Sequence, residues 1–488
     1  MSAQKPTRKP TQKSTQKPVR TRFAPSPTGY LHVGGIRSAL FNWLWAKHTG
    51  GTFVLRLEDT DRNRLVEGAV DQICDSLAAL GIAPDEGPRE GGGYGPYVQS
   101  ERIAIYQEHA RELIKTGALY RCWCSPERLD TLRAETQKTG VAFKYDRHCL
   151  NPENARPETE PHVLRFRIPK TPETIGWDDA VRGRLEFKAA DLDDFVALKA
   201  DGFPTYHLAN VIDDHLMKIS HVMRADEWLP STPKHLLLFA AFGWDAPIYV
   251  HLPPVQGPDG RKKLSKRDGA QSVQEYLDAG YLPETLRSFL ASLGWNDGTT
   301  QEVYATDELI EKFSLERIQR SPAKFDQDRL TWINGVMIRR LPLPELLERC
   351  APFWPAGAAA TPAGYRLEVL RLVQERLKFL SELSALTGFF FADPTFTPEL
   401  LVAKKLDADT ARAWLSTIIK TLETADFTEA DLDTRLRALV EQLETSPGVL
   451  FSLIRRVVTG TTVAPGLFET LHVLGQEVTL RRLHAAAA

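Results

Sequence analysis

The chain of 488 residues lacks any apolar run that approaches the roughly 18 residues needed to span a bilayer. Its N-terminus also lacks the apolar block of a signal peptide. We therefore expect a cytoplasmic protein without a membrane partner. Cysteine is scarce, and an odd number of five argues against a disulfide framework and for reduced thiols or a metal site.

Several catalytic motifs are also missing. The sequence contains no GxxxxGK[ST] phosphate loop, no GxGxxG, no serine-nucleophile elbow and no HExxH. The net charge of −2 does not identify a partner, because the basic groups of a nucleic-acid-binding protein can gather on one face. The composition, 42% hydrophobic and 25% charged, is typical of a globular protein with several domains.

The most informative segment present is residues 22–35, RFAPSPTGYLHVGG. The pattern predicts a short strand over residues 21–24, a loop rich in Pro and Gly, and a helix that begins near Gly34 and buries Ile36, Leu40 and Leu44. The free N–H groups of such a helix start attract an anion. Glycine at 34 and 35 leaves room for a nucleotide, and His32 can donate to a phosphate oxygen. The segment therefore predicts an ATP site.

Polar residues follow the next predicted strands. A strand over 53–57 ends at Glu58, and apolar strands over 203–211 and 221–223 bring Tyr206, Asn210 and Arg224 toward the same edge. In a parallel α/β sheet this carboxyl edge holds the ligand crevice. Glu58 is suited to an ammonium group, whereas Asp59 and Asp61 are more readily explained as caps of the following helix.

Two further segments carry candidate residues. Residues 253–268 form a loop with the sequence KLSKR at 263–267. Three thiols, Cys122, Cys124 and Cys149, lie in an irregular stretch between the predicted strands. A structural zinc ion takes four ligands, and Tyr145 or His148 is the candidate fourth.

PSPTGYLHVGG together with KLSKR resembles the two signatures of class I aminoacyl-tRNA synthetases, with Gly35 where many members have a second His. LRLEDTDR (55–62), YHLANVIDDH (206–215) and VMRADEWLPSTPKH (222–235) resemble the glutamyl branch of that family. The motifs cover about residues 20–340. The remainder is similar in length and in helical character, with Leu450, Leu453, Ile454 and Val457 at helical spacing.

The resemblance implies an α/β fold in which a Rossmann-like parallel-sheet catalytic domain carries an inserted acceptor-end-binding domain and is followed by an all-α anticodon-binding region. The expected parts are a disordered basic tail (1–20), the first half of the catalytic fold (21–98), the inserted domain (99–201), the second half (202–256), the KLSKR loop and a helical connector (257–340) and the helical region (341–488). The implied reaction is ATP-dependent ligation of L-glutamate to the 3′ end of its tRNA through a glutamyl-adenylate, with release of AMP and pyrophosphate.

The resemblance also implies roles for individual residues. The catalytic set is His32, Gly34, Gly35, Lys263, Ser265 and Lys266. The ATP-binding set, which acts with Mg²⁺, is Pro25, Thr28, His32, Gly35 and Lys266. The glutamate-binding set is Arg22, Ser26, Glu58, Tyr206, Asn210 and Arg224.

The zinc site stays open at this point. Some relatives carry a fourth ligand two residues beyond the last Cys, and this chain has Asn151 there, a poor ligand. The spacing of Tyr145 and Cys149 resembles instead a Cys, Cys, Tyr, Cys arrangement in a shortened paralogue.

The motifs are shared in part by four rival classes of protein. These are a glutaminyl-type synthetase, the shortened paralogue that modifies a tRNA base and lacks the helical region, a catalytically silent tRNA-binding relative and a small-molecule nucleotidyltransferase. The resemblance favours the glutamyl enzyme and implies a monomer, with tRNA(Glu), L-glutamate and ATP as partners.

Overall fold

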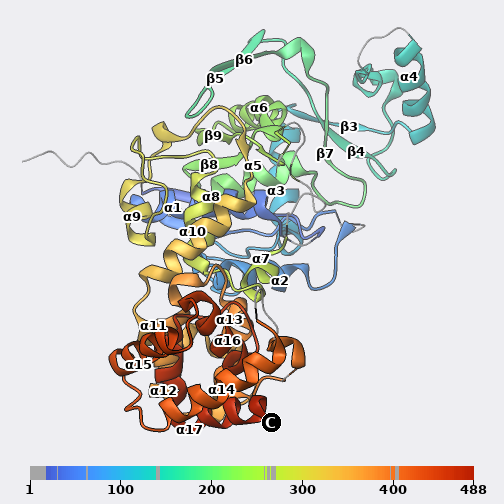
Figure 1. The fold of residues 1–488 in the computed structure, drawn as a ribbon. Coiled ribbons are helices and arrows are strands. Elements are labelled where there is room, and N and C mark those ends of the chain that lie inside the picture. Colours follow the sequence, from blue (N-terminus) through green and yellow to red (C-terminus); the bar gives the residue numbers. More distant parts are fainter. Residues whose placement is uncertain are drawn as a thin grey trace, which may run out of the picture. The chain divides into compact units, whose positions relative to one another are not determined.

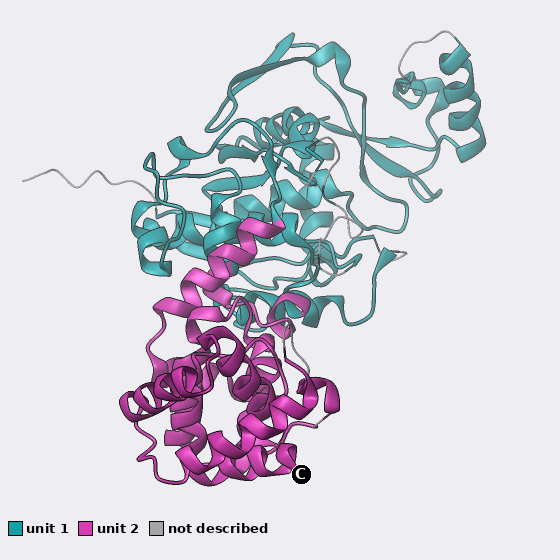
Figure 2. Ribbon diagram, in the orientation of Figure 1, with its two compact units in different colours: residues 1–274, 286–326 teal, residues 275–285, 327–488 magenta. Residues whose placement is uncertain are grey.

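The computed structural model describes residues 18–29, 31–61, 64–138, 143–257, 259–260, 264, 271–395, 397–401 and 406–488. The chain forms two compact units, residues 1–274 with 286–326 and residues 275–285 with 327–488 (Figure 2). The predicted site residues all belong to the first unit. Of these, Lys263, Ser265 and Lys266 lie outside the described residues, as does most of the predicted basic tail.

The first unit contains the strands and seven whole helices among its described residues (Figure 1). Its strands are β1 Arg20–Phe23, β2 Thr52–Leu55, β3 Leu119–Cys122, β4 Val163–Phe166, β5 Thr174–Asp179, β6 Gly183–Lys188, β7 Val196–Leu198, β8 His221–Ala225, β9 Ile248–Leu252, β10 Val255–Gln256 and β11 Ala323–Lys324. Its helices are α1 Val33–His48, α2 Ala69–Ala79, α3 Ile103–Lys115, α4 Pro126–Lys138, α5 Tyr206–Leu216, α6 Thr232–Phe242 and α9 Thr306–Lys312. The residues of α7 Val273–Asp278 and α8 Pro283–Ser292 are divided between the units.

The central sheet has the strand order β2-β1-β8-β9, and all three pairings are parallel. The register places Arg22 opposite Val54 and Arg224 opposite His251. All four strands therefore end at one edge, which is the place where open α/β sheets bind ligands. This architecture confirms the predicted α/β fold class.

Helix α1 follows β1 through the loop at 24–32, as the sequence predicts. Ile36, Leu40 and Leu44 are buried, and the helix contacts β1, β2 and β8. The apolar face is packed on the sheet, so the first turn of α1 is held at the carboxyl edge.

The strand predicted over 203–211 is wrong. These residues lead into α5 Tyr206–Leu216, in which every residue from 208 to 214 is buried. The sequence did carry a helical signal, since Leu208, Val211, Ile212 and Leu216 recur at helical spacing, and the interpretation of 203–211 as one apolar run overlooked it. The consequence is that Tyr206 and Asn210 lie one helical turn apart on the same face of α5.

Between β2 and α5 the chain forms an antiparallel sheet, β3-β4-β7, and a separate hairpin, β5-β6. The core beneath this sheet is shared with α3, α5 and α6; for example, Phe166 and Leu164 belong to the same buried cluster as Leu208 and Leu238. The inserted segment is thus packed directly onto helices that border the central sheet.

The second unit is helical, as predicted. Its helices are α10 Gln327–Arg340, α11 Leu343–Arg349, α12 Ala363–Val373, α13 Leu383–Phe391, α14 Ala408–Leu422, α15 Glu429–Gln442, α16 Pro447–Thr459 and α17 Leu467–Ala487. The four residues of 450–457 singled out by their spacing are buried in its core. Among the described residues, no helix combines the length and apolarity needed to cross a membrane.

Candidate functional site

A cavity of about 570 Å³ opens at the carboxyl edge of the central sheet. The predicted residues that line it are Arg22, Pro25, Ser26, Thr28, His32, Gly34, Gly35, Glu58, Tyr206, Asn210 and Arg224. Every described member of the catalytic, ATP-binding and glutamate-binding sets is therefore at one site.

His32 caps the N-terminus of α1, where its Nδ1 accepts a hydrogen bond from the Gly34 N–H over 3.2 Å. A neutral imidazole with Nδ1 as acceptor carries its proton on Nε2. His32 is exposed, so its Nε2–H is the donor that the ring can offer to an anion. The role of His32 as a donor to phosphate stays a prediction, and the cap is a further role of its ring.

Gly35 also has a packing reason to be glycine. A Cβ at this position would lie 2.7 Å from Leu31 Cδ1, whereas one at Gly34 would meet only the His32 ring, at 3.3 Å. Gly35 therefore lets the loop before α1 close against the helix, and this keeps the backbone of the first turn at the cavity.

The Glu58 carboxylate accepts hydrogen bonds from two side chains. Its Oε1 accepts from Arg56 Nη2 at 3.0 Å and from Asn210 Nδ2 at 2.9 Å. Burial raises the pKa of the Glu58 carboxyl above its ordinary value, although the cations of Arg56 and Arg22 and the Asn210 hydrogen bond act in the opposite direction. The other side of the amide, Asn210 Oδ1, is buried and accepts no hydrogen bond from any described residue.

A buried charge network lies beneath these groups. Asp214 accepts from Arg22 Nε at 3.2 Å and from Arg56 Nη1 at 2.7 Å. Asp213 accepts from Arg102 Nε at 2.7 Å and lies 3.8 Å from Arg56 Nε. We did not predict Arg56, Asp213 or Asp214 from the sequence, although two consecutive acids within the apolar run of 203–216 are an unusual signal.

Arg224 uses both edges of its guanidinium. Nε donates to His251 Nε2 at 3.1 Å, Nη2 donates to Thr232 Oγ1 at 2.9 Å, and Nη1 donates to Tyr206 OH at 2.9 Å. The charge also lies over the Tyr249 ring, 5.4 Å from its centroid. The quoted motifs include Arg224, Tyr206 and Thr232, but they gave Thr232 no role and do not contain His251 or Tyr249.

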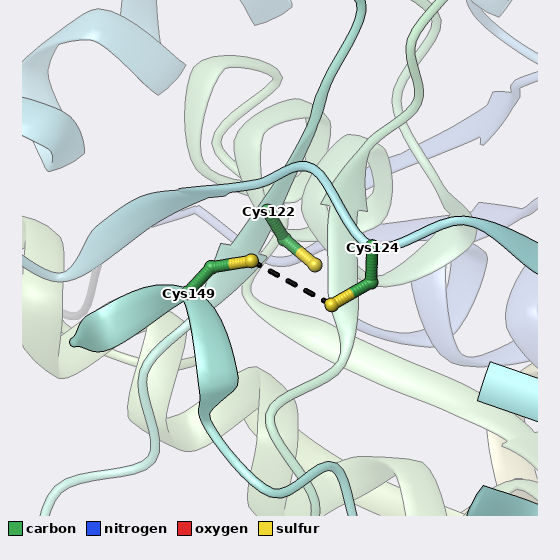
Figure 3. A group of neighbouring side chains, drawn as sticks. All are labelled: Cys122, Cys124 and Cys149. Carbon is green, nitrogen blue, oxygen red and sulfur yellow. Dashed lines mark hydrogen bonds between the residues drawn. The ribbon is translucent and has the colours of Figure 1, made fainter. Parts of the chain in front are cut away.

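The three thiols form a second site, in the inserted segment (Figure 3). The Sγ atoms of Cys122, Cys124 and Cys149 lie within 4.8 Å of one another and point toward a common centre. The Tyr145 hydroxyl lies 3.3 Å from Cys122 Sγ and 3.4 Å from Cys124 Sγ. It also accepts from the Cys149 backbone N–H at 3.1 Å.

The other candidates for a fourth ligand are occupied. His148 Nδ1 is 3.3 Å from Asn154 Nδ2, and Asn151 caps the short turn at Glu153. Two cations adjoin the thiols, since Arg128 Nη1 lies 3.6 Å from Cys124 Sγ and Arg165 stacks on the Tyr145 ring at 4.1 Å. Burial opposes ionisation of Cys122, but hydrogen bonds with Tyr145 and Arg165 outweigh it and lower the pKa of that thiol, whereas burial raises the pKa of Cys124 to about 11. Three thiols and a phenol within reach of one point form a donor set that fits Zn²⁺.

Comparison with known families identifies the class of protein to which this parallel sheet and its cavity belong. Residues 18–332 match the model of the tRNA synthetases class I (E and Q), catalytic domain, and residues 345–487 match an anticodon binding domain. Proteins named glutamate–tRNA ligase are similar over nearly the whole chain. That of Dehalococcoides mccartyi is 47% identical over 96% of this chain and 97% of its own length, and that of Chlorobium luteolum is 42% identical over 95% and 96%.

Solved structures are also similar over nearly the whole chain. A glutamate tRNA ligase from Elizabethkingia meningosepticum, in complex with its amino acid, has a TM-score of 0.87 and 33% identity, and the match covers 96% of this chain and 99% of that one. The glutamate-tRNA synthetase of Elizabethkingia anophelis has a TM-score of 0.84 at 34% identity, covering 96% and 100%. The chain belongs to the class I tRNA synthetases and, within them, to the glutamate–tRNA ligase family.

Proposed function

We propose that this chain joins L-glutamate to tRNA at the cavity described above, and that glutamate and ATP bind there side by side. The family reaction is an ATP-dependent aminoacylation through a glutamyl-adenylate, which releases pyrophosphate and then AMP. One observation carries the assignment: a helix start suited to phosphate and a pair of buried guanidinium groups open into a single cavity.

Glutamate is oriented by opposite charges at its two ends. Its α-ammonium lies between the Glu58 carboxylate and Asn210 Oδ1, the buried acceptor to which no described residue donates. Its γ-carboxylate accepts from Arg22 and Arg224, with Tyr206 as a neutral partner. Ser26, on the loop after β1, contributes a hydroxyl to the same end of the cavity.

ATP binds along the loop before α1. Pro25 and Thr28 border the nucleotide, Gly35 allows the backbone of the first turn to approach the phosphates, and His32 donates from Nε2. Mg²⁺ accompanies the triphosphate and neutralises part of its charge. By the resemblance of KLSKR, Lys263, Ser265 and Lys266 supply the remaining phosphate contacts.

The chemistry then requires position and charge rather than a side-chain base. A carboxylate is already a nucleophile, so the α-carboxylate attacks the α-phosphorus once the two are aligned. Charge that develops on the leaving pyrophosphate is met by the α1 N–H groups, His32 and the lysines. Removal of one such donor typically costs about 10²- to 10³-fold in rate.

Glutamine is rejected because its amide leaves buried guanidinium groups without a counter-charge. A site built on polar pairing can discriminate by ~10⁴ or more against an analogue that lacks the partner, so no editing site is required. This pocket favours a glutamate enzyme over a glutaminyl-type one. The helical second unit favours the same choice, because it matches an anticodon binding domain of helical character.

The inserted segment holds structural Zn²⁺ on Cys122, Cys124, Cys149 and Tyr145. The ion would fix β3 and the turn at 148–150 relative to each other, and it takes no part in the reaction. We further propose that the enzyme works as a monomer in the cytoplasm, that the inserted segment receives the acceptor end of tRNA(Glu), and that residues 341–488 read the anticodon.

Aminoacylation of purified tRNA(Glu) and tRNA(Gln), with glutamate or glutamine, tests the function. We expect tRNA(Glu) to be charged with glutamate and not with glutamine, and the tRNA(Gln) arm shows whether that tRNA also receives glutamate. The variant Arg224→Gln should raise the KM for glutamate sharply while the KM for ATP stays near that of the wild type. Charging with glutamine, or an unchanged KM for glutamate in the variant, would contradict the pocket assignment.

A further inference from the structure

A buried relay of polar side chains lies behind the amino-acid end of the cavity. His251, on β9, is fully buried, and its Nδ1 is 2.6 Å from Asp179 Oδ2 on β5. Its Nε2 accepts from Arg224 Nε on the adjacent strand β8, at 3.1 Å, in keeping with the register that pairs these two residues. Asp179 and His251 do not line the cavity. Arg224 is the cavity residue to which His251 is hydrogen-bonded.

The donors and acceptors of this relay can occupy only one arrangement. A guanidinium has N–H donors and no acceptor, so His251 Nε2 must present its lone pair to Arg224. The single proton of the neutral ring is then on Nδ1, where the Asp179 carboxylate accepts it. Burial and the charge of Arg224 lower the pKa of His251, although Asp179 acts in the opposite direction, and this keeps the ring neutral.

We propose that Asp179 and His251 are positioning residues for glutamate selection, which hold the Arg224 guanidinium in the orientation that receives the γ-carboxylate. This inference rests on the proposed role of Arg224. Thr232 Oγ1 accepts from Nη2 on the same side, so two acceptors fix the inner edge of the guanidinium. Nη1 remains on the side of Tyr206, which lines the cavity.

Asp179 is itself fixed by the hairpin to which it belongs. Its Oδ1 accepts from the backbone N–H groups of Val181 and Arg182, at 3.0 and 2.9 Å, and so closes the turn between β5 and β6. Since this hairpin lies in the segment inserted between the halves of the central sheet, the inserted segment contributes a residue to the amino-acid site. The predicted boundaries had assigned that segment to the tRNA acceptor end alone.

Asp179→Asn tests the relay because it should move the ring proton of His251 from Nδ1 to Nε2. The amide has one oxygen, and if this oxygen accepts from the three backbone N–H groups of Val181, Arg182 and His251, the NH₂ group faces His251 Nδ1. The ring must then carry its proton on Nε2, where it meets the N–H of Arg224. We expect kcat/KM for glutamate to fall by about 10²-fold, since misplacement of a binding group by ~1 Å has an effect of that size. The fall should be in KM for glutamate, and the KM for ATP should remain near that of the wild type.

The matched control is Asp178→Asn, the same change one residue earlier on β5. The Asp178 side chain is 82% exposed and lies 3.5 Å from Arg184 in an exposed pair. Its kinetics should equal those of the wild type. Equal kinetics for Asp179→Asn and Asp178→Asn would overturn the relay.

Two substitutions at His251 separate positioning from mere packing. In His251→Gln the side-chain oxygen can replace Nε2 as the acceptor for Arg224, whereas in His251→Asn the amide can replace only the Nδ1 donor to Asp179. If the relay acts through Arg224, the KM for glutamate should be lower in His251→Gln than in His251→Asn. The opposite order would mean that the Asp179 bond only anchors the hairpin, and the proposal would fail.

Arg224→Gln, measured in the same assay, separates this inference from the proposed function. A raised KM for glutamate in Arg224→Gln, with unchanged values in Asp179→Asn and in both His251 variants, refutes the relay alone. An unchanged KM in Arg224→Gln refutes the assignment of Arg224 and the relay with it.

Discussion

Asn210 Nδ2 donates a 2.9 Å hydrogen bond to Oε1 of Glu58, which lies 152 residues earlier in the chain. This bond joins α5 to the residues that follow β2, so it ties the two halves of the catalytic fold together at the cavity. The bonds from Arg56 and from Asn210 both end on Oε1. Oε2 is then the oxygen that we assign to the substrate ammonium.

Asn210→Ala should change how glutamate binding depends on pH. The Asn210 hydrogen bond favours the ionised carboxyl and lowers the Glu58 pKa against the upward effect of burial. Without it the pKa rises further, so Glu58 becomes neutral at a higher pH. We expect the acid limb of kcat/KM for glutamate to move to higher pH, measured in aminoacylation assays across the acid range.

Asn296→Ala is the control, because Asn296 only closes an exposed turn at Gly298. Its acid limb should coincide with that of the wild type. Glu58→Gln should bind glutamate weakly, and its kcat/KM for glutamate should show no acid limb. An acid limb in Asn210→Ala that coincides with the wild-type limb would show that the amide does not tune Glu58.

Asp213→Ala should destabilise the first unit strongly. Asp213 accepts hydrogen bonds from Arg102, Gln99 and Tyr106, and it adjoins Arg56 in a region without solvent. Removal of one member of a buried charge network leaves an uncompensated cation and typically costs about 3 to 5 kcal/mol. The urea midpoint of unfolding, followed by circular dichroism, measures the loss.

Asp71→Ala serves as its comparison, because Asp71 is 75% exposed in its pair with Arg89. Exposed ion pairs contribute little, so this midpoint should change hardly at all. Similar midpoints for the two variants would mean that the buried carboxylate is dispensable.

The residues that line the cavity were predictable from the sequence, and the residues that hold them in place were not. His32, Gly34 and Gly35 follow one another on a strand, loop and helix whose apolar pattern is unambiguous, so local sequence fixes their place. Arg224 was found by its motif. Its supports, Asp179, Thr232 and His251, come from three other elements, and only the tertiary fold brings them within hydrogen-bond distance.

The principal error was the strand predicted over 203–211. In α5 the apolar residues recur at helical spacing, at Leu208, Val211, Ile212 and Leu216, and the polar residues Asn210, Asp213 and Asp214 face the buried charge network instead of solvent. The sequence therefore carried the helical period, and the interpretation of 203–211 as one apolar run missed it. In the inserted segment the Cys spacing indicated a metal site, but the choice of Tyr145 over His148 required the geometry.

His221 should make stability depend on pH. It is 8% exposed, at the start of β8, and burial lowers its pKa to about 4. Because the folded-state pKa lies below the unfolded value of about 6.5, the stabilisation is present above pH 6.5 and is lost as the pH falls toward 4. Between pH 8 and 5 this amounts to about 2 kcal/mol.

His221→Phe removes the titrating group and keeps an aromatic edge against Trp45, whose ring centroid is 5.8 Å away. Near pH 8 the urea midpoints of wild type and variant should differ only by a packing contribution. As the pH falls to 5, the wild-type midpoint should decrease relative to that of the variant. Parallel midpoints across this range would exclude His221 as the source of the pH dependence.

The cysteine site yields a prediction that does not involve catalysis. Purified enzyme should hold one zinc ion per chain, measured by mass spectrometry of the metal, and Cys149→Ser should abolish it because two thiolates and a phenol bind zinc poorly. Tyr145→Phe should retain the ion but release it to a chelator at least about tenfold faster, as expected when a contact to the metal centre is lost.

Cys350→Ser is the matched control, since Cys350 is a free, fully buried thiol of the second unit. It should hold zinc as the wild type does. Release from Tyr145→Phe at the wild-type rate would exclude the phenol as a ligand. Absence of zinc from wild-type enzyme that is purified and then incubated with the ion would exclude the site.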